Sequence, residues 1–257
     1  MRRTLSPSRT PSVVSGLLVI LALGALLGIT ALPAGPSQAW AQKTEDLAEG
    51  QTADATPFFH GQRVGPILEA TSLEEFLRPY PSDVVYGDPE APLTIFEFSS
   101  FTCPHCARMH QEIMPTLIAD YILMGQVKVV FRDFPLDQFA AGVGLVGQCI
   151  ADQNAYYGFV GRVFSEQSIW IASDTPIAHI LRIAAGVGLP EEEGLACLNN
   201  QAALDFLIDR RTLAVELVGV RATPTLMLTG EGLAPQALTT HDLPTIRQEL
   251  DAALEAL

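Results

Sequence analysis

Apolar positions along the chain predict four β-strands. Residues 93–98 (LTIFEF) are mostly apolar and rich in β-forming side chains, and the turn-forming GDPEAP comes directly before them. Residues 127–134 (VKVVFRDF) have the same character, and residues 226–229 follow the turn-like RATPT. A fourth strand is predicted near residues 236–239, after the turn at GEG. The long intervals between these strands must therefore hold the connecting elements.

Helical patterns fill those intervals. Residues 104–125 (PHCARMHQEIMPTLIADYILMG) predict a helix, because proline suits its first position and glycine can end it. Residues 138 to about 218 predict successive helices broken at Gly and Pro, and residues 243–257 predict a last amphipathic helix. Strands separated by helices predict an α/β core, and the block of helices in its middle predicts an inserted all-helical subdomain.

The N-terminus has the layout of an export signal. Three arginines precede residues 13–32, which contain no charged side chain, and the small residues of Ala39-Trp40-Ala41 follow. This order predicts a signal peptide over residues 1–41, cut after Ala41. The alternative is an uncleaved anchor, since about 20 apolar residues can span a bilayer. Either alternative exports the rest of the chain.

The charge after residue 41 excludes some classes of partner. That part of the chain has 12 basic and 29 acidic side chains, a net charge of −17. Such a balance argues against nucleic acid or an anionic membrane surface as a partner. Residues 42–83 are polar and mixed, with a short helix predicted at residues 71–77. We interpret residues 42–83 as an N-terminal extension, ordered in part at most.

Two of the four cysteines lie close together in the stretch FTCPHCARMH. Cys103 and Cys106 could be a zinc site, a structural disulfide or a redox pair. A zinc site made of Cys103, Cys106 and His110 lacks a fourth ligand. The other two cysteines are distant in sequence and do not form a close pair. A structural disulfide over a two-residue gap constrains little of the unfolded chain. We therefore predict a redox pair and no metal.

The redox interpretation has a physical basis. Cys103 comes directly before a predicted helix that begins at Pro104, and the free N–H groups there favour negative charge on its sulfur. His105 adds a donor or a positive charge between the two cysteines. Stabilising the reduced pair makes it an oxidant, which gives its disulfide away. Cys106, one turn into the helix, is expected to be more buried and to act as the resolving thiol.

Two other positions are candidates for the same site. Glu97 lies in the apolar run six residues before Cys103, where a buried carboxylate is costly unless it is used or hydrated. It either relays the proton of Cys106 or faces water on an alternating strand, and the residues leave both alternatives open. Pro224, preceded by Thr223, requires a turn just before the third strand.

These residues carry a resemblance. VVYGDPEAPLTIFEFSSFTCPHC together with RATPTLML is similar to the thioredoxin-fold DsbA-type thiol:disulfide oxidoreductases of bacterial envelopes. The resemblance covers about residues 84–257, including the helical insertion at about 138–218. It implies a thioredoxin fold, Cys103 as the nucleophile with Cys106 as its partner, and Glu97 as the buried acid. It also implies that Pro224 is a cis-proline against the active disulfide, and that the Thr223 backbone pairs with the substrate chain.

The resemblance also implies partners and a second disulfide. Such proteins oxidise unfolded or reduced exported polypeptides and are reoxidised by a quinone-linked membrane protein, without an organic cofactor. Some relatives carry a second disulfide in the insertion, which leads us to expect a structural Cys149–Cys197 bond; two buried free thiols are the alternative. Residues 42–83 are too short for a substantial dimerisation domain, which favours a monomer.

The sequence thus predicts a periplasmic disulfide oxidase. Two other functions of the same fold are alternatives. Thr223 is found before the cis-proline in isomerases and reductases as well as in oxidases. A reductase or isomerase is therefore the first alternative. A peptide-binding chaperone module that uses the groove beside Pro224 is the second, and the intact cysteine pair argues against it.

Overall fold

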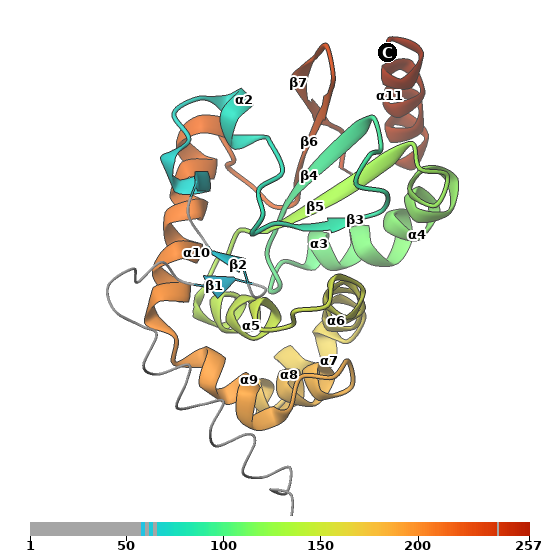
Figure 1. The fold of residues 1–257 in the computed structure, drawn as a ribbon. Coiled ribbons are helices and arrows are strands. Elements are labelled where there is room, and N and C mark those ends of the chain that lie inside the picture. The colour runs from blue at the N-terminus through green and yellow to red at the C-terminus, as the bar shows by residue number, and fades with distance from the viewer. Residues whose placement is uncertain (1–57, 60–61, 64–65, 241) are drawn as a thin grey trace, which may run out of the picture. The chain divides into compact units, whose positions relative to one another are not determined.

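The computed structural model describes residues 58–59, 62–63, 66–240 and 242–257 (Figure 1). The predicted signal peptide or anchor, residues 1–41, and most of residues 42–65 lie outside the described residues. Within them, two short strands, β1 (Phe58–Phe59) and β2 (Gln62–Arg63), pair antiparallel. No helix among the described residues is long and apolar enough to cross a membrane.

The core is a five-stranded sheet with the order β3-β5-β4-β6-β7. Its strands are β3 (Val84–Tyr86), β4 (Leu93–Ser99), β5 (Val127–Asp133), β6 (Thr225–Gly230) and β7 (Leu233–Leu238). Strands β4 and β5 are parallel, and the other neighbours are antiparallel. All four predicted strands are present. The sequence did not predict β3, because three residues are too few to show the period-two pattern of a strand.

Side chains alternate across β4 and separate two cores. Leu93 and Ile95 pack on one face with the helix after Cys103 and with α11 (Leu243–Glu255). Phe96 and Phe98 pack on the opposite face with residues 67–77 and α10 (Gln201–Leu213). The period of two therefore turns Glu97 toward the helix that carries Cys106.

The helix after Cys103 is continuous but not regular. It consists of α3 (Pro104–Arg108), the π-helical η2 (Met109–Ile113), α4 (Met114–Leu117) and the π-helical η3 (Ile118–Ile122). Pro115 has no N–H, and its ring would clash with a carbonyl one turn earlier, so the preceding turn widens. Gly125, with a φ of 69°, supplies the left-handed conformation that follows the helix.

Helices fill the interval between β5 and β6 (Figure 1). They are α5 (Gln138–Gln148), α6 (Gln153–Ser165), α7 (Gln167–Ile171), α8 (Pro176–Ala185), α9 (Glu191–Leu198) and α10, followed by the π-helical η4 (Ala214–Val218). Phe101, Cys103 and Cys106 belong to the same apolar core as Phe159 and Trp170 of this block. The predicted fold class, a thioredoxin fold with inserted helices, is confirmed, and the cysteine pair lies where the two parts meet.

Residues 66–83, the described part of the predicted N-terminal extension, pack on the sheet and contain the short helix predicted at residues 71–77. They form η1 (Pro66–Glu69) and α2 (Leu73–Phe76), which Ser72 caps by accepting a hydrogen bond from the N–H of Glu75. Ile67 and Phe76 are fully buried against the sheet. This region looks polar in sequence, but its few apolar side chains all face the same core.

A buried ion pair attaches this segment to the sheet. Asp83 accepts hydrogen bonds from Arg132 of β5, with its two oxygens 3.1 Å from Nε and 2.7 Å from Nη2. Arg132 also donates to the carbonyls of Phe76 and Arg78, at 2.5 Å and 2.9 Å. Its guanidinium lies 4.4 Å from the centre of the Phe96 ring. The charge is thus satisfied by hydrogen bonds on all sides, as burial requires.

Candidate active site

Cys103 is the N-cap residue of α3. Its backbone is extended (φ −80°, ψ 120°), and Pro104 begins the helix. The Cys103 N–H donates to the carbonyl of Ser100 at 3.0 Å, and the Cys103 carbonyl accepts from the N–H of Ala107 at 3.2 Å. The sulfur therefore lies at the positive end of the helix, as the sequence indicated. Both Cys103 and Cys106 are in the thiol form.

The turn before β6 lies against Cys103. The Thr223–Pro224 peptide bond is cis. The Cys103 thiol donates a hydrogen bond to the Thr223 carbonyl, with 3.2 Å between sulfur and oxygen. Thr225 closes the turn, since its hydroxyl donates to the carbonyl of Ala222 at 2.8 Å. The structure thus brings together two sequence motifs that are 120 residues apart.

Gln167 is a site residue that the sequence did not reveal. Its side-chain amide, in α7 of the insertion, donates to the carbonyls of Phe101 and Cys103 at 2.8 Å and 3.0 Å. The residue is buried. It fixes the backbone on both sides of Thr102 and links the insertion to the cysteine loop. A glutamine at a helix start carries no signal in sequence that would have identified it.

Cys106 lies inside the protein. Its side chain is fully buried, and this burial raises the pKa of its thiol to about 12. Hydrogen bonds from the Ser99 hydroxyl and the Ser100 backbone lower that pKa, while the charges of Cys103 and Glu97 raise it. The balance favours the protonated thiol, because few polar groups replace the lost water.

Glu97 is buried on the same side of the sheet as Cys106. None of its side chain is exposed, so it does not face water, and of the two alternatives left open in sequence only the inward orientation is observed. Its Oε1 accepts from the Ser99 hydroxyl at 2.5 Å and lies 2.7 Å from Nε2 of His110. Its Oε2 has no hydrogen-bond partner.

His110, weighed in sequence only as a zinc ligand, is the second residue whose place in the site the sequence did not reveal. Its imidazole pairs with Glu97 and stacks on the Phe164 ring of α6, with 4.3 Å between ring centres. Its side chain is 7% exposed. The signal was present, since His110 follows Cys106 by four residues and so shares its helix face. His105, by contrast, is exposed near the start of α3.

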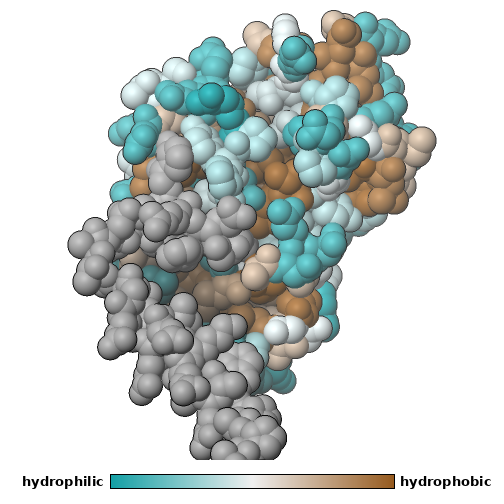
Figure 2. All heavy atoms as spheres, viewed as in Figure 1, coloured by the Kyte–Doolittle hydropathy of each residue, from teal (hydrophilic) through white to brown (hydrophobic). Residues whose placement is uncertain are grey.

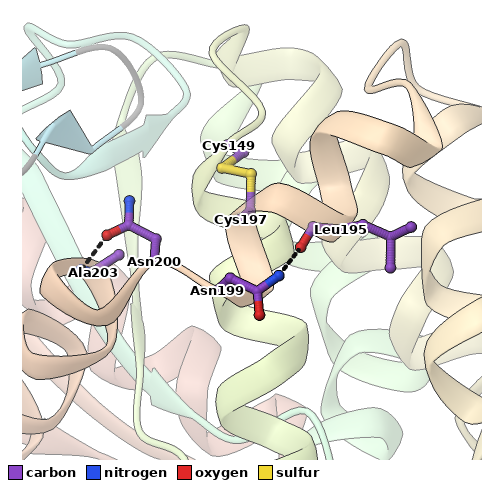
Figure 3. The surroundings of a disulfide bond; sticks show 6 residues. All are labelled: Cys149, Leu195, Cys197, Asn199, Asn200 and Ala203. Atoms are coloured by element: carbon purple, nitrogen blue, oxygen red, sulfur yellow. Dashed lines mark hydrogen bonds between the residues drawn. A yellow bond between two sulfur atoms is a disulfide. The ribbon is translucent and has the colours of Figure 1, made fainter. Parts of the chain in front are cut away.

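The other two cysteines form a disulfide far from this loop. Cys149 ends α5 and Cys197 lies in α9, and their sulfurs are bonded (Figure 3). Asn199 and Asn200 follow, and Asn200 caps α10 by accepting from the N–H of Ala203 at 3.0 Å. The bond joins residues 48 apart in sequence, both within the helical block.

The described residues contain no group of three or more His, Cys, Asp or Glu side chains arranged to hold a metal ion. Cys103 and Cys106 provide the chemistry of two thiols with hydrogen-bonded neighbours. A dithiol at a helix start, against a cis-proline turn and above a buried carboxyl group, defines the class of thioredoxin-fold dithiol proteins.

Comparison with known proteins assigns the family. The family model described as thioredoxin matches residues 80–244, so the chain belongs to the thioredoxin family. A Rickettsia prowazekii protein named as a protein-disulfide oxidoreductase is 26% identical over 174 residues, which cover 68% of this chain and 62% of that protein. The chain thus matches less than two thirds of that relative's length.

Solved structures place the chain within this family. Wolbachia pipientis alpha-DsbA1 is 27% identical and superposes with a TM-score of 0.65, covering 72% of this chain and 97% of that one. BdbD from Bacillus subtilis, 20% identical with a TM-score of 0.58, covers 67% and 93% and shares the fold. The chain is a DsbA-like member of the thioredoxin family.

Proposed function

We propose that this protein is a thiol:disulfide oxidase that introduces disulfides into exported polypeptides through Cys103 and Cys106. The observation that carries the proposal is the Cys103 thiol at a helix start, hydrogen-bonded to the carbonyl before a cis-proline, with Cys106 buried beneath it. Both cysteines are buried, but Cys103 is 5% exposed and Cys106 is not exposed at all, so we propose that substrates react at Cys103.

The reaction follows from this asymmetry. In the oxidised protein, a substrate thiolate attacks the Cys103 sulfur, and Cys106 leaves and gains a proton. A second substrate thiolate then attacks the substrate sulfur of this mixed disulfide. The substrate disulfide forms, Cys103 leaves as a thiolate, and the protein is left as the dithiol. Two electrons pass from substrate to protein, so a separate oxidant must restore the pair. We propose a quinone-linked membrane thiol oxidase for that role.

The direction of electron flow depends on which redox state is more stable. The N-terminus of the helix favours negative charge on Cys103, and stabilising the reduced form makes the pair oxidising. The Cys149–Cys197 bond also fits a compartment in which disulfides persist. We therefore propose an exported, periplasmic protein, with residues 13–32 serving either as part of a signal peptide or as a tether.

Exposed apolar side chains in α7 support a substrate class. Ile169 and Ile171 of α7 are 59% and 48% exposed, close in sequence to the Gln167 that contacts the Cys103 carbonyl. Figure 2 shows apolar residues, in brown, among polar ones on the face that it presents. Unfolded polypeptides expose apolar side chains, so we propose reduced, unfolded chains as substrates, bound by a monomer.

A reductase or isomerase is the second candidate. Thr223 before the cis-proline favours it, because relatives of those classes also have threonine there. A peptide-binding chaperone module needs no reactive cysteines, and full activity of a Cys103→Ser variant would support it.

The reduction potential of the Cys103–Cys106 couple tests the proposal. The protein without residues 1–41 is equilibrated with glutathione buffers, and the fraction oxidised is measured by alkylation and mass spectrometry. An oxidase is expected to have a potential well above that of the glutathione buffer. A value near that of thioredoxin would overturn the oxidase assignment and favour the reductase or isomerase.

A further inference from the structure

The Cys106 thiol must exchange a proton inside the protein at every turnover. Its side chain is fully buried, and burial raises its pKa to about 12. The thiolate is the species that attacks a disulfide, so at neutral pH the thiol has to lose its proton as the attack occurs. A buried sulfur cannot give that proton directly to water.

A chain of hydrogen bonds begins at this sulfur. The Ser99 side chain has a hydrogen bond with the Cys106 sulfur. Its hydroxyl donates to Oε1 of Glu97 at 2.5 Å, which leaves the Ser99 oxygen to accept from the Cys106 thiol. The same Oε1 lies 2.7 Å from Nε2 of His110. Ser99 and Glu97 are fully buried, whereas His110 is 7% exposed. The chain therefore runs from the sulfur to a side chain at the edge of the solvent.

The unpartnered oxygen of Glu97 gives the chain an open acceptor. Oε2 is buried and has no hydrogen-bond partner. A buried polar oxygen without a partner is unusual and costs free energy. Ser99 therefore leads to a carboxyl group that has an unused acceptor oxygen.

We propose that Ser99, Glu97 and His110 form a proton path for Cys106, in which Ser99 is the link to the sulfur and His110 the exit to water. This inference rests on the proposed dithiol–disulfide exchange. It gives a function to Ser99 and His110, and it adds both an entry and an exit to the relay predicted for Glu97.

The step balances as follows for Cys106 attacking a mixed disulfide at Cys103. The new bond joins the two cysteine sulfurs, and the partner sulfur leaves with the electron pair. The Cys106 proton moves to the Ser99 oxygen while the Ser99 hydroxyl proton moves to Oε1 of Glu97, so the serine is regenerated. The Glu97–His110 pair then holds one additional proton, which the imidazole releases to water. The reverse sequence supplies a proton when Cys106 leaves a disulfide.

A single-turnover experiment tests the path. The reduced protein is mixed with an aromatic disulfide that forms the mixed disulfide at Cys103, and the attack by Cys106 then releases a second coloured thiolate. Because that thiolate leaves without a proton, a pH-indicator dye in the same solution reports the proton lost by Cys106. Comparing the rates of the two signals shows whether proton release keeps pace with formation of the Cys103–Cys106 disulfide.

Two variants interrupt the path at its two ends. Ser99→Ala removes the hydroxyl, and we expect the Cys106 attack to slow about 10- to 100-fold. His110→Gln can still donate to Glu97 but cannot carry a proton, so we expect proton release to lag behind disulfide formation. Ser99→Thr keeps a hydroxyl and is expected to restore the rate, which a purely structural role in packing would not predict.

Matched controls separate the path from general damage. Ser82→Ala changes another buried serine, 3% exposed, outside the site. His179→Gln breaks a second His–Glu pair with the same 2.7 Å distance, to Glu166. Each control is expected to behave as wild type, and circular dichroism checks folding. If Ser99→Ala does not fold, the proton-release lag of His110→Gln decides.

The outcomes distinguish the two proposals. If wild type releases the second thiolate but Ser99→Ala and His110→Gln match their controls in both signals, the proton path is wrong and the exchange function stands. If wild type itself never releases the second thiolate, dithiol–disulfide exchange at this pair fails, and the path fails with it.

Discussion

The Cys103 thiol and the Thr223 carbonyl form a hydrogen bond, with 3.2 Å between sulfur and oxygen, although 120 residues separate them in sequence. The contact places the reactive sulfur beside a backbone group at the start of β6, next to the cis-proline. Under the proposed function, a substrate chain that reaches Cys103 also meets this backbone. The proposal therefore treats reaction at Cys103 and binding at Thr223 as parts of one site.

Cys106 is proposed as the resolving thiol, so we expect its removal to trap substrates as mixed disulfides with Cys103. In Cys106→Ala, a mixed disulfide between Cys103 and a partner has no internal thiol to resolve it. We expect such complexes to accumulate severalfold over wild type, as bands on non-reducing gels that disappear on reduction. Cys103→Ala should form none. Equal accumulation in both variants would contradict the assignment of Cys103 as the nucleophile.

The raised pKa of Cys106 predicts a pH dependence of stability in the reduced protein. The folded state holds the thiol proton more tightly than the unfolded state, so this stabilisation is complete below the ordinary pKa of 9.0. It is lost as pH rises from 9.0 toward about 12. The loss amounts to about 4 kcal/mol. Denaturant titrations of the reduced protein at several pH values measure it.

Cys106→Ala is the control for this pH effect, because it keeps every tyrosine whose own titration contributes in that range. The pKa values of Tyr121, Tyr156 and Tyr157 are also raised by burial, and both proteins share those contributions. We expect the free energy of unfolding to fall more steeply with pH in reduced wild type than in Cys106→Ala. Parallel curves would contradict the raised pKa.

The Cys149–Cys197 disulfide is expected to stabilise the fold without taking part in exchange. It joins residues 48 apart in sequence, and a loop of this length corresponds to about 4 kcal/mol in the chain-entropy model. We expect a Cys149→Ala/Cys197→Ala variant to lose about 2 to 4 kcal/mol of unfolding free energy and to keep its rate of reaction at Cys103. A large loss of that rate in the folded variant would give the bond a redox role.

The buried pair of Asp83 and Arg132 predicts strong destabilisation when one partner is removed. Asp83→Ala leaves the Arg132 guanidinium buried with part of its charge uncompensated, and the cost should be about 3 to 5 kcal/mol. Denaturant unfolding measures this, with exposed Asp174→Ala as a control expected to change little. Replacing both partners, as Asp83→Leu with Arg132→Met, should recover part of the loss. A double variant worse than the single one would contradict this account.

The sequence was sufficient for the strands whose patterns are long or strongly apolar. The predicted strands at residues 93–98, 127–134 and 226–229 are all present, the second ending at Asp133, and so is the helical block after residue 138. The pattern failed at β3, which is too short to show a period. At residues 66–83 the pattern predicted the short helix but not its place, because a few apolar side chains in a polar stretch are enough to pack on the sheet.

The sequence by itself determined the helix start at Pro104 and the fold class, because local spacing and hydrophobic periodicity depend on neighbouring residues. It also predicted Cys103 and Cys106 as the reactive pair. Only the tertiary structure decided that Glu97 faces inward, that His110 pairs with it and that Gln167 holds the Cys103 loop. Each of these depends on which face of a strand or helix meets another element. Side chains distant in sequence are brought within hydrogen-bonding distance only when the whole chain packs, and no local pattern records that.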